Sequence, residues 1–493
     1  MTLYTVRLFL YLSIKKRTIQ GAKWSIIDNA ANTGITFLVG LVLARLLSPE
    51  QFGIIGIATI FINLFNTIAI GGLDIALIRK NDCNDTDFNT TFYSNLTLAL
   101  ILIAILCLCA SPLSIFFNEP QLATLLPTMS IILLINAAAS IQRTILTKQL
   151  DFKTQAIISL YASTISGIIA IAMALNDFGV WSLVAQQIIR QTIISLLLWI
   201  KGTWKPAFAF STTAFKDLFG FSWKVLAANI VNSLFRDAFL AVIGKVHTSQ
   251  SLGYYNRADQ FKSIFTNNLS QIVQKVSMPA MSEIQDDKQK LQLAFRKIVN
   301  YTALVSFSFG LIMIAVAKPM ILLLIGEKWL PAVKYLQIMC TYAIIAPVTI
   351  LNANLLNLFK RSDLYLKIEL IKKLLFALVI LAGVFFSIET MLWCAVGYYY
   401  IDYFITSFYS FRLIGYGVKA QMTDLLPILL ISFIISALIW SITLIELPHI
   451  ATLIIQLSLA AGLYHIAFRI IKKTEVTELK EIIINEVKKT FSK

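Results

Sequence analysis

The chain has 493 residues, of which 58% are hydrophobic and only 14% are charged, and its mean hydropathy is +0.76. Soluble proteins carry about a quarter charged residues, so this composition excludes a soluble globular protein and predicts a polytopic membrane protein. The formal net charge of +16 is explained by membrane topology and anionic lipid headgroups, so we expect no nucleic-acid partner.

The first twenty residues contain an apolar run between Arg7 and the basic cluster Lys15-Lys16-Arg17. A secretory signal peptide has basic residues before its apolar run and a small-residue cleavage site after it. Here the basic cluster follows the run and no such cleavage pattern comes next. Residues 1–20 are therefore predicted to form a cytoplasmic, interfacial segment.

Fourteen apolar stretches follow, and each is long enough for a membrane-crossing helix. Such a helix needs about 20 predominantly apolar residues to span about 30 Å of hydrocarbon. The stretches lie near 21–45, 52–78, 91–117, 121–146, 153–175, 178–200, 215–243, 252–280, 298–325, 332–358, 364–387, 390–414, 421–444 and 448–471. The predicted fold class is an all-α polytopic membrane protein with fourteen transmembrane helices.

The first half of the chain recurs, in weakened form, in the second half. The segment Gly21 to Trp24 corresponds to Gly220 to Trp223 at an offset of 199 residues, and Gly53 corresponds to Gly253. Later pairs reach an offset of 212, as expected if one half has longer loops: Lys148 with Lys360, Asp151 with Asp363 and Trp181 with Trp393. Spans 1 to 6 therefore pair with spans 7 to 12.

An even number of spans in each repeat gives both copies the same orientation, so the repeat is parallel and not inverted. We predict two pseudo-symmetric six-helix lobes, the architecture of a transporter whose site lies between the lobes. The predicted domains are an N-terminal segment at 1–20, an N-lobe at 21–202, a C-lobe at 203–418, two further spans at 419–472 and a cytoplasmic tail at 473–493.

The distribution of basic residues predicts the orientation of the chain in the membrane. Loops on the side of the N-terminus carry seventeen Lys and Arg residues, whereas the opposite loops carry Arg45, Lys245 and Lys328, with Lys318 and Lys334 at span ends. Basic residues concentrate in cytoplasmic loops. Both termini are therefore predicted to be cytoplasmic.

Catalytic and metal-binding signatures are missing from the sequence. There is no P-loop or HExxH motif, the three histidines are scattered, and the loops between spans are short. The triplet Asp85-Thr-Asp87 resembles the acidic pair of glycosyltransferases, but next to Asp82 and Asn84 we interpret it as a solvated helix cap. We expect a protein that is not an enzyme and has no cofactor, with proton or sodium coupling as an option.

Ionisable residues inside the predicted spans carry the functional information. Each costs about 2.5–3.5 kcal/mol at a helix centre, so such residues usually face a bundle interior or an aqueous cavity. The basic ones are Arg190, Arg236, Arg257, Lys262 and Lys275, and the acidic ones are Asp28, Asp74, Asp237 and Asp259.

Each of these residues also has a structural interpretation. Arg236 with Asp237, and Asp259 with Lys262, are spaced for ion pairing, and Lys275 is close enough to a span end to reach the headgroups. Asp28 and Asp74 have Lys23 and Arg79 as candidate partners. Arg190 and Arg257 have no obvious local acidic partner in the sequence, which favours a cavity-lining role. Guanidinium groups recognise phosphate through bidentate, charge-assisted hydrogen bonds, so an anionic cargo is predicted.

Several motifs resemble the Wzx-type polysaccharide flippases of the multidrug/oligosaccharidyl-lipid/polysaccharide (MOP) exporter superfamily. The resemblance covers spans 1 to 12 and rests on motifs in combination. They are Leu43 to Gly53 (LARLLSPEQFG), Gly71 to Arg79 (GGLDIALIR), Leu146 to Lys153 (LTKQLDFK), Phe178 to Gln187 (FGVWSLVAQQ), Leu252 to Arg257 (LGYYNR), Met278 to Met281 (MPAM) and Gly326 to Trp329 (GEKW).

The resemblance implies a V-shaped, monomeric flippase of the bacterial inner membrane that works by alternating access. Its cargo would be an undecaprenyl-diphosphate-linked oligosaccharide, moved from the cytoplasmic to the periplasmic leaflet for O-antigen, capsule or exopolysaccharide synthesis. Basic residues would bind the head group and the four aspartates would pair with them or couple transport to protons. Expected partners are the lipid-linked oligosaccharide, membrane lipids and other glycan-assembly proteins.

Three other classes stay open from the residues alone. A MATE-like drug or cation antiporter would have the same lobes but would depend on acidic residues such as Asp28 and Asp74. A membrane-embedded glycosyltransferase or ligase would need a large outward loop with catalytic acids, which the sequence lacks. A non-transporting scaffold of a glycan-assembly complex would leave the many buried charges unexplained.

Overall fold

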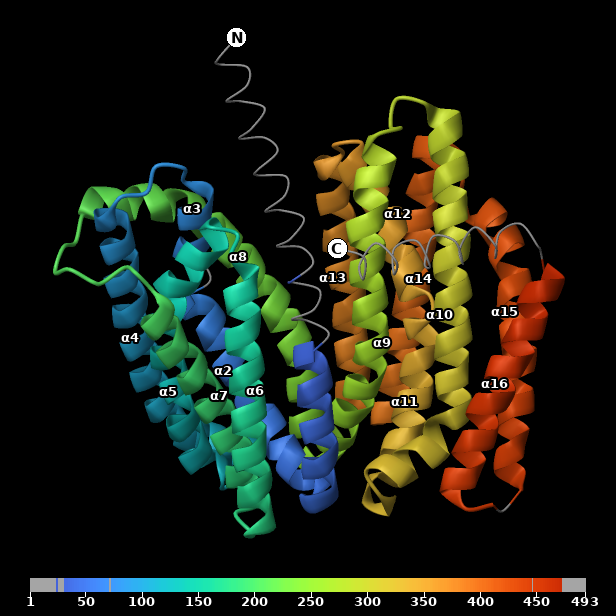
Figure 1. The fold of residues 1–493 in the computed structure, drawn as a ribbon, viewed down its shortest axis with the longest axis horizontal. Helices are drawn as coiled ribbons and strands as arrows, with labels where there is room; N and C mark the ends of the chain where they lie inside the picture. Colours follow the sequence, from blue (N-terminus) through green and yellow to red (C-terminus); the bar gives the residue numbers. More distant parts are fainter. Residues whose placement is uncertain (1–23, 25–30, 71, 446, 472–493) are drawn as a thin grey trace. The chain divides into compact units, whose positions relative to one another are not determined.

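The computed structural model describes residues 24, 31–70, 72–445 and 447–471, all of them in helices, turns or irregular segments (Figure 1). The predicted N-terminal segment 1–20, the predicted tail 473–493 and Asp28 lie outside these residues. Contacts divide the chain into two units. The first runs to Arg257 and includes Ile380–Met391, and the second comprises Ala258–Val379 and the residues from Leu392 onward.

Ten helical segments in the described ranges are long and apolar enough to cross a membrane. They are α2 (Pro49–Ile70), α4 (Asp85–Phe117), α5 (Leu122–Lys148), α6 (Phe152–Leu175), α7 (Val180–Lys201), α8 (Thr212–Val242) with η1 (Ile243–His247), α10 (Lys288–Leu324), η2 (Glu327–Trp329) with α11 (Leu330–Ala343) and α12 (Ala346–Leu358), α15 (Val418–Ser441) with η3 (Ile442–Leu444), and α16 (His449–Ile471). The chain is thus an all-helical, multi-pass membrane protein.

The prediction of fourteen spans is confirmed for these ten. Helices also occupy the other four predicted positions, but each of them falls short either in described length or in apolarity. The first is described over Ala31–Leu46 only. Charged and tyrosine residues lower the apolarity of the other three: α9 (Ser249–Ser282), α13 (Ser362–Phe385) and α14 (Ile388–Ile414).

Two predicted spans are broken rather than continuous. The stretch 52–78 forms α2 and a separate short helix, α3 (Leu73–Arg79), because the glycine pair at 71–72 has poor helix propensity. The stretch 332–358 forms α11 and α12, and Pro347 in the first turn of α12 cannot donate the backbone hydrogen bond that would continue a single helix. Asp74 therefore lies on α3 and not inside a long span.

The start of α4 confirms the helix cap predicted at Asp85-Thr-Asp87. The Asn84 side chain accepts a hydrogen bond from the Asp87 backbone N–H at 2.8 Å, and the Asp87 carboxylate accepts one from the Asn84 N–H at 3.1 Å. This reciprocal pair satisfies two N–H groups that the helix itself leaves free. The cap is not solvated as predicted, because Asp87 is 1% exposed and binds Lys80 at 2.7 Å. The same hydrogen bond raises the pKa of Lys80.

In the first unit, α5 is the central helix, since it packs against α2, α4 and α7, while α6 packs along α7. The first turns of α2 and α9 approach so closely that only glycine fits at Gly53 and Gly253. A Cβ on Gly53 would overlap the carbonyl oxygen of Ser249, and one on Gly253 would overlap that of Pro49. These two glycines correspond in the predicted internal repeat, and small residues allow such close helix packing in membranes.

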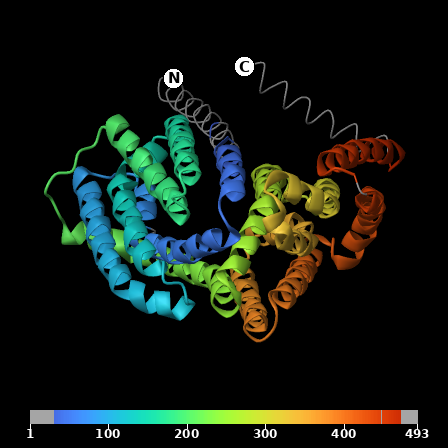
Figure 2. The same ribbon diagram turned by 90° about the horizontal axis from the view of Figure 1, so that it is seen from below.

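In the second unit, α10 packs against α11, α12, α15 and α16. Phe295, Leu351 and Tyr416 are among the buried residues of its main apolar cluster. The last two helices, α15 and α16, form a hairpin beside α10, which Figures 1 and 2 show at the edge of this unit. Arg296 of α10 donates two hydrogen bonds of 2.6 Å to Asp424 of α15, and this bidentate ion pair joins the hairpin to the unit.

Candidate functional site

One face of α7 in the first unit carries polar side chains near the middle of an otherwise apolar helix. Gln187, Arg190 and Gln191 are three and four residues apart, so their side chains project from the same face. All three are half-buried. Arg190 donates from Nε to the Ser163 hydroxyl of α6 at 3.2 Å, and from Nη2 to the Asn32 amide oxygen at 3.3 Å.

The two glutamines extend this network to α2 and α5. Gln187 donates to the Thr59 hydroxyl at 3.4 Å, and Gln191 donates to the Asn136 amide oxygen. Asn136 in turn donates to the Asn66 amide oxygen at 2.9 Å. We call the whole set the α7 polar network; it comprises Asn32, Thr59, Asn66, Asn136, Ser163, Gln187, Arg190 and Gln191.

The α7 polar network is chemically suited to a hydroxyl-rich cargo. Asn and Gln amides offer both donors and acceptors, and hydroxyls do the same. Its members other than Ser163 are half-buried, so their polar groups are covered only in part. Sequence reasoning found Arg190 but missed the amides because they carry no charge. The spacing of Gln187, Arg190 and Gln191 within one apolar span was the signal that could have revealed them.

Arg257 has a different environment from Arg190. The residue is 6% exposed, and its guanidinium carbon lies 3.9 Å from the centre of the Phe52 ring on α2. A cation over an aromatic face is attracted by the ring quadrupole. This contact holds the first part of α9 against α2, next to the Gly53 and Gly253 crossing.

The two predicted ion pairs are both present. Arg236 binds Asp237 at 2.9 Å, with the arginine side chain 61% exposed and the aspartate 5% exposed. In the second unit, Lys262 binds Asp259 at 2.6 Å and also donates to the Tyr342 hydroxyl at 3.1 Å. Both pairs neutralise charge inside helices, which is the structural interpretation that the spacing had left open.

Asp74 has a neutral hydrogen-bond partner that the sequence did not indicate. Its carboxylate accepts a hydrogen bond from the Asn95 amide of α4 at 3.0 Å, and the same amide donates to Ser140 of α5 at 3.2 Å. The charge of Arg143 on α5 also acts on this carboxylate. Of the remaining predicted site residues, Asp28 lies outside the described residues, as does the side chain of Lys275.

A second charged cluster, which sequence reasoning missed, joins α13 and α14 in the second unit. Lys372 binds Glu369 at 2.8 Å and Asp402 at 3.1 Å. The Lys372 side chain is 15% exposed and that of Asp402 is 7% exposed. A charged residue inside an apolar span is costly here just as at Lys262. The charged residues within the predicted spans 364–387 and 390–414 were therefore the signal that could have revealed this cluster.

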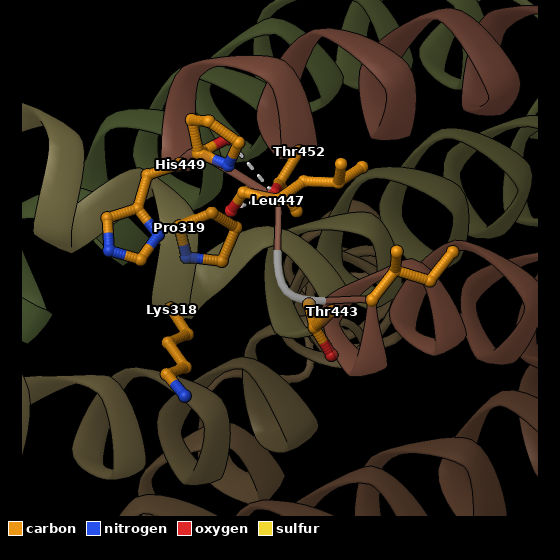
Figure 3. A pocket seen from close by; sticks show the side chains of 8 residues that line it. Lys318, Pro319, Thr443, Leu447, His449 and Thr452 are labelled. Atoms are coloured by element: carbon orange, nitrogen blue, oxygen red, sulfur yellow. Dashed lines mark hydrogen bonds between the residues drawn. The ribbon is translucent and has the colours of Figure 1, made fainter.

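The second unit also contains a pocket of about 410 Å³ at one end of the α15–α16 hairpin (Figure 3). Lys318 and Pro319 of α10 line it, together with Thr443, the segment from Leu447 to His449, and Thr452. In Figure 3 the Lys318 side chain extends away from His449, so the two basic groups do not converge on one point. Within the described residues, no group of three or more His, Cys, Asp or Glu side chains could hold a metal ion.

Long apolar helices that enclose amides and ion pairs are typical of polytopic membrane transporters. Residues 42–334 match the family described as "Polysaccharide biosynthesis protein". The chain belongs to this family of Wzx-like flippases in the MOP superfamily, which consists of transporters and not of enzymes.

Similar proteins come from several bacteria. The chain is 27% identical to the succinoglycan biosynthesis transport protein ExoT of Rhizobium meliloti (strain 1021), over 64% of each protein. It is 26% identical to the teichuronic acid biosynthesis protein TuaB of Bacillus subtilis (strain 168), over 95% of this chain and 98% of TuaB. Among solved structures, the lipid II flippase MurJ in an inward-closed conformation matches 92% of this chain and 99% of MurJ, with a TM-score of 0.70 and 14% identity. The chain therefore has the MurJ-like fold.

Proposed function

We propose that this protein is a flippase that moves a polyprenyl-diphosphate-linked oligosaccharide from the cytoplasmic to the outer leaflet of the bacterial cytoplasmic membrane. Membership of the polysaccharide biosynthesis family supports a lipid-linked glycan as the cargo. The names of ExoT and TuaB refer to the synthesis of two different polysaccharides, which supports transport of a glycan precursor over transport of drugs or cations.

The α7 polar network is the observation that carries this proposal. A sugar head group loses its hydrogen bonds to water when it enters hydrocarbon, at a cost of several kcal/mol for each unsatisfied polar group. Amides and hydroxyls on α2, α5, α6 and α7 replace water for the sugar hydroxyls, and the Arg190 guanidinium binds a phosphate oxygen. No bond is broken, so the protein needs only to lower the barrier.

The predicted basic residues have different roles in this proposal: some contact the head group and one holds two helices together. Arg190 and Lys262 are the head-group contacts in the N-lobe (21–202) and the C-lobe (203–418), and Lys275 stays a proposed substrate-binding residue. Arg236 is exposed enough to meet the cargo while its partner Asp237 keeps it oriented. Arg257 acts mainly by holding α9 against α2. The lobes open alternately to each leaflet, both termini are cytoplasmic and the protein works as a monomer.

The test replaces single residues in a strain whose surface glycan depends on this chain as its only flippase. Arg190→Ala should reduce glycan display at least about tenfold, because hydrogen bonds to a charged group contribute about 1.5–3 kcal/mol each. Gln191→Ala should reduce it only a few-fold, since a neutral hydrogen bond contributes about 1 kcal/mol. Lipid-linked units should accumulate on the cytoplasmic side in both variants.

The matched control is Arg361→Ala, which removes an exposed guanidinium whose partner is the neighbouring Asp363. It should leave glycan display unchanged. Normal glycan display in membranes that contain Arg190→Ala at wild-type abundance would contradict the proposed role of the α7 polar network. Loss of dye efflux with intact glycan display would instead favour a drug antiporter.

A further inference from the structure

The cluster of Glu369, Lys372 and Asp402 holds more negative than positive charge around one lysine. Two carboxylates share the Lys372 ammonium at 2.8 and 3.1 Å. Lys373 also acts on Glu369, but the charges that act on Asp402 are those of Lys372 and Glu369 alone among the described residues. Asp402 thus faces one cation that is shared with another anion.

The two carboxylate oxygens of Asp402 differ in their contacts with the described residues. Oδ2 binds Lys372, whereas Oδ1 is buried and has no partner among the described residues. The aspartate side chain is 7% exposed, so bulk water does not solvate this oxygen freely. An ionised carboxylate in such a position pays a large desolvation cost, and a neutral carboxyl group pays much less.

The surroundings favour a proton over a metal ion. The Lys372 ammonium already occupies the space between the two carboxylates, where a metal cation would have to bind, and it would repel one. Calcium and magnesium also need several oxygen ligands, for which carboxylates are the usual source. The other titratable neighbours of Asp402 are instead three tyrosines, Tyr365, Tyr398 and Tyr399. A proton needs only the free Oδ1.

We propose that Asp402 is a proton-binding site of this transporter, at which Oδ1 takes a proton from one aqueous side and releases it to the other. The inference rests on the proposed flippase function only for what the proton drives. The charge of Asp402 acts on Tyr399, whose ring stacks on Tyr342 with centroids 4.4 Å apart, and Tyr342 accepts a hydrogen bond from Lys262, a proposed cargo contact. Protonation would free Lys372 to favour Glu369 and so alter the packing of α13 on α14.

Infrared difference spectra of the purified protein in lipid vesicles, recorded between pH 5 and pH 8 in choline-based buffer, test this site without any cargo. At low pH the wild type should show a C=O stretching band from protonated carboxyl groups, and Asp402→Asn should lose the contribution of one carboxylic acid from it. Asp363→Asn is the matched control, because Arg361 holds the pKa of this exposed carboxyl below its ordinary value, so it stays ionised throughout. An unchanged band in Asp402→Asn overturns the proposal.

A second variant keeps the test decisive if Asp402→Asn does not insert. Lys372→Gln removes the one ammonium bound to Asp402 among the described residues, so the midpoint of the Asp402 contribution should move to higher pH by about one unit or more. An unmoved midpoint overturns the proposal. Loss of the band when sodium replaces choline at constant pH also overturns it, in favour of a metal-ion site. The infrared result and the flippase function can fail separately. If the band behaves as expected but the wild-type protein does not restore surface glycan, the flippase function is refuted and the proton site is supported.

Discussion

The crossing of α2 and α9 provides the sharpest test of the packing in the first unit. In Gly53→Ala the new methyl carbon would lie at less than half the ordinary 3.4–4 Å contact distance from the Ser249 carbonyl oxygen. A backbone carbonyl cannot rotate away as a side chain can, so the two helices must move apart by about 2 Å locally. Overpacking of this kind costs about 3 kcal/mol or more. Alanine recovers about 1 kcal/mol of helix propensity, which leaves a net loss of about 2 kcal/mol.

Thermal unfolding of the detergent-purified protein measures this loss as a fall in apparent Tm of several degrees. Gly34→Ala is the matched control, because a Cβ at Gly34 would meet no atom within 4 Å and should leave Tm unchanged or slightly higher. Gly253→Ala should resemble Gly53→Ala. The double variant should lose less than the sum, since one separation of the helices relieves both overlaps. A Gly53→Ala protein as stable as the wild type would refute the reasoning.

Three further predictions concern single contacts. Asp424→Asn removes the bidentate partner of Arg296. Because the arginine side chain is 53% exposed, the free energy of unfolding should fall by only about 1 kcal/mol. A fall as small as that in Arg361→Ala would contradict the role of this ion pair in holding α15. Asp87→Ala should lower Tm by the equivalent of about 1–2 kcal/mol, because it removes the cap of α4. Asp85→Ala, at an exposed position, should leave Tm unchanged. Equal effects of the two substitutions would refute the stabilising role of the Asp87 cap. The raised pKa of Lys80 gives a stability contribution that is complete below its unfolded value of 10.5 and is lost as pH rises through the higher folded value. The Tm of the wild type, but not that of Asp87→Ala, should therefore fall further in strongly alkaline buffer. Parallel curves of Tm against pH for the two proteins would exclude a contribution from the Lys80–Asp87 pair.

Local features of the fold could be predicted well from the sequence. Runs of apolar residues predicted the positions of the ten helical segments, in the part of the chain that the structure describes, that are long and apolar enough to cross a membrane, and the Asn84 to Asp87 pattern predicted the start of α4. Motifs such as Leu43 to Gly53 indicated the family that the comparison supports over residues 42–334. These features depend on residues that are neighbours along one helix, so spacing and composition are sufficient.

The contacts of the candidate site could not be predicted in the same way. Arg190 was expected to face a cavity, but its hydrogen-bond partners, Ser163 and Asn32, come from two other helices. The sequence interpretation missed Glu369, Lys372 and Asp402. All three are charged residues within predicted spans, as the identified site residues are. Pairing across helices depends on the rotation and register of each helix, and neither quantity leaves a periodic trace in the sequence.

The sequence by itself determined the membrane class, most of the helical spans, the helix cap and the family, because hydrophobicity and local hydrogen bonding act over a few residues. The tertiary structure decided which buried polar groups meet: the amides around Arg190, the Arg257 stack on Phe52, the crossing at Gly53 and Gly253, and the free oxygen of Asp402. A polar group inside a membrane must find a partner wherever helix packing places one, so the identity of that partner is fixed by packing and not by its position along the chain.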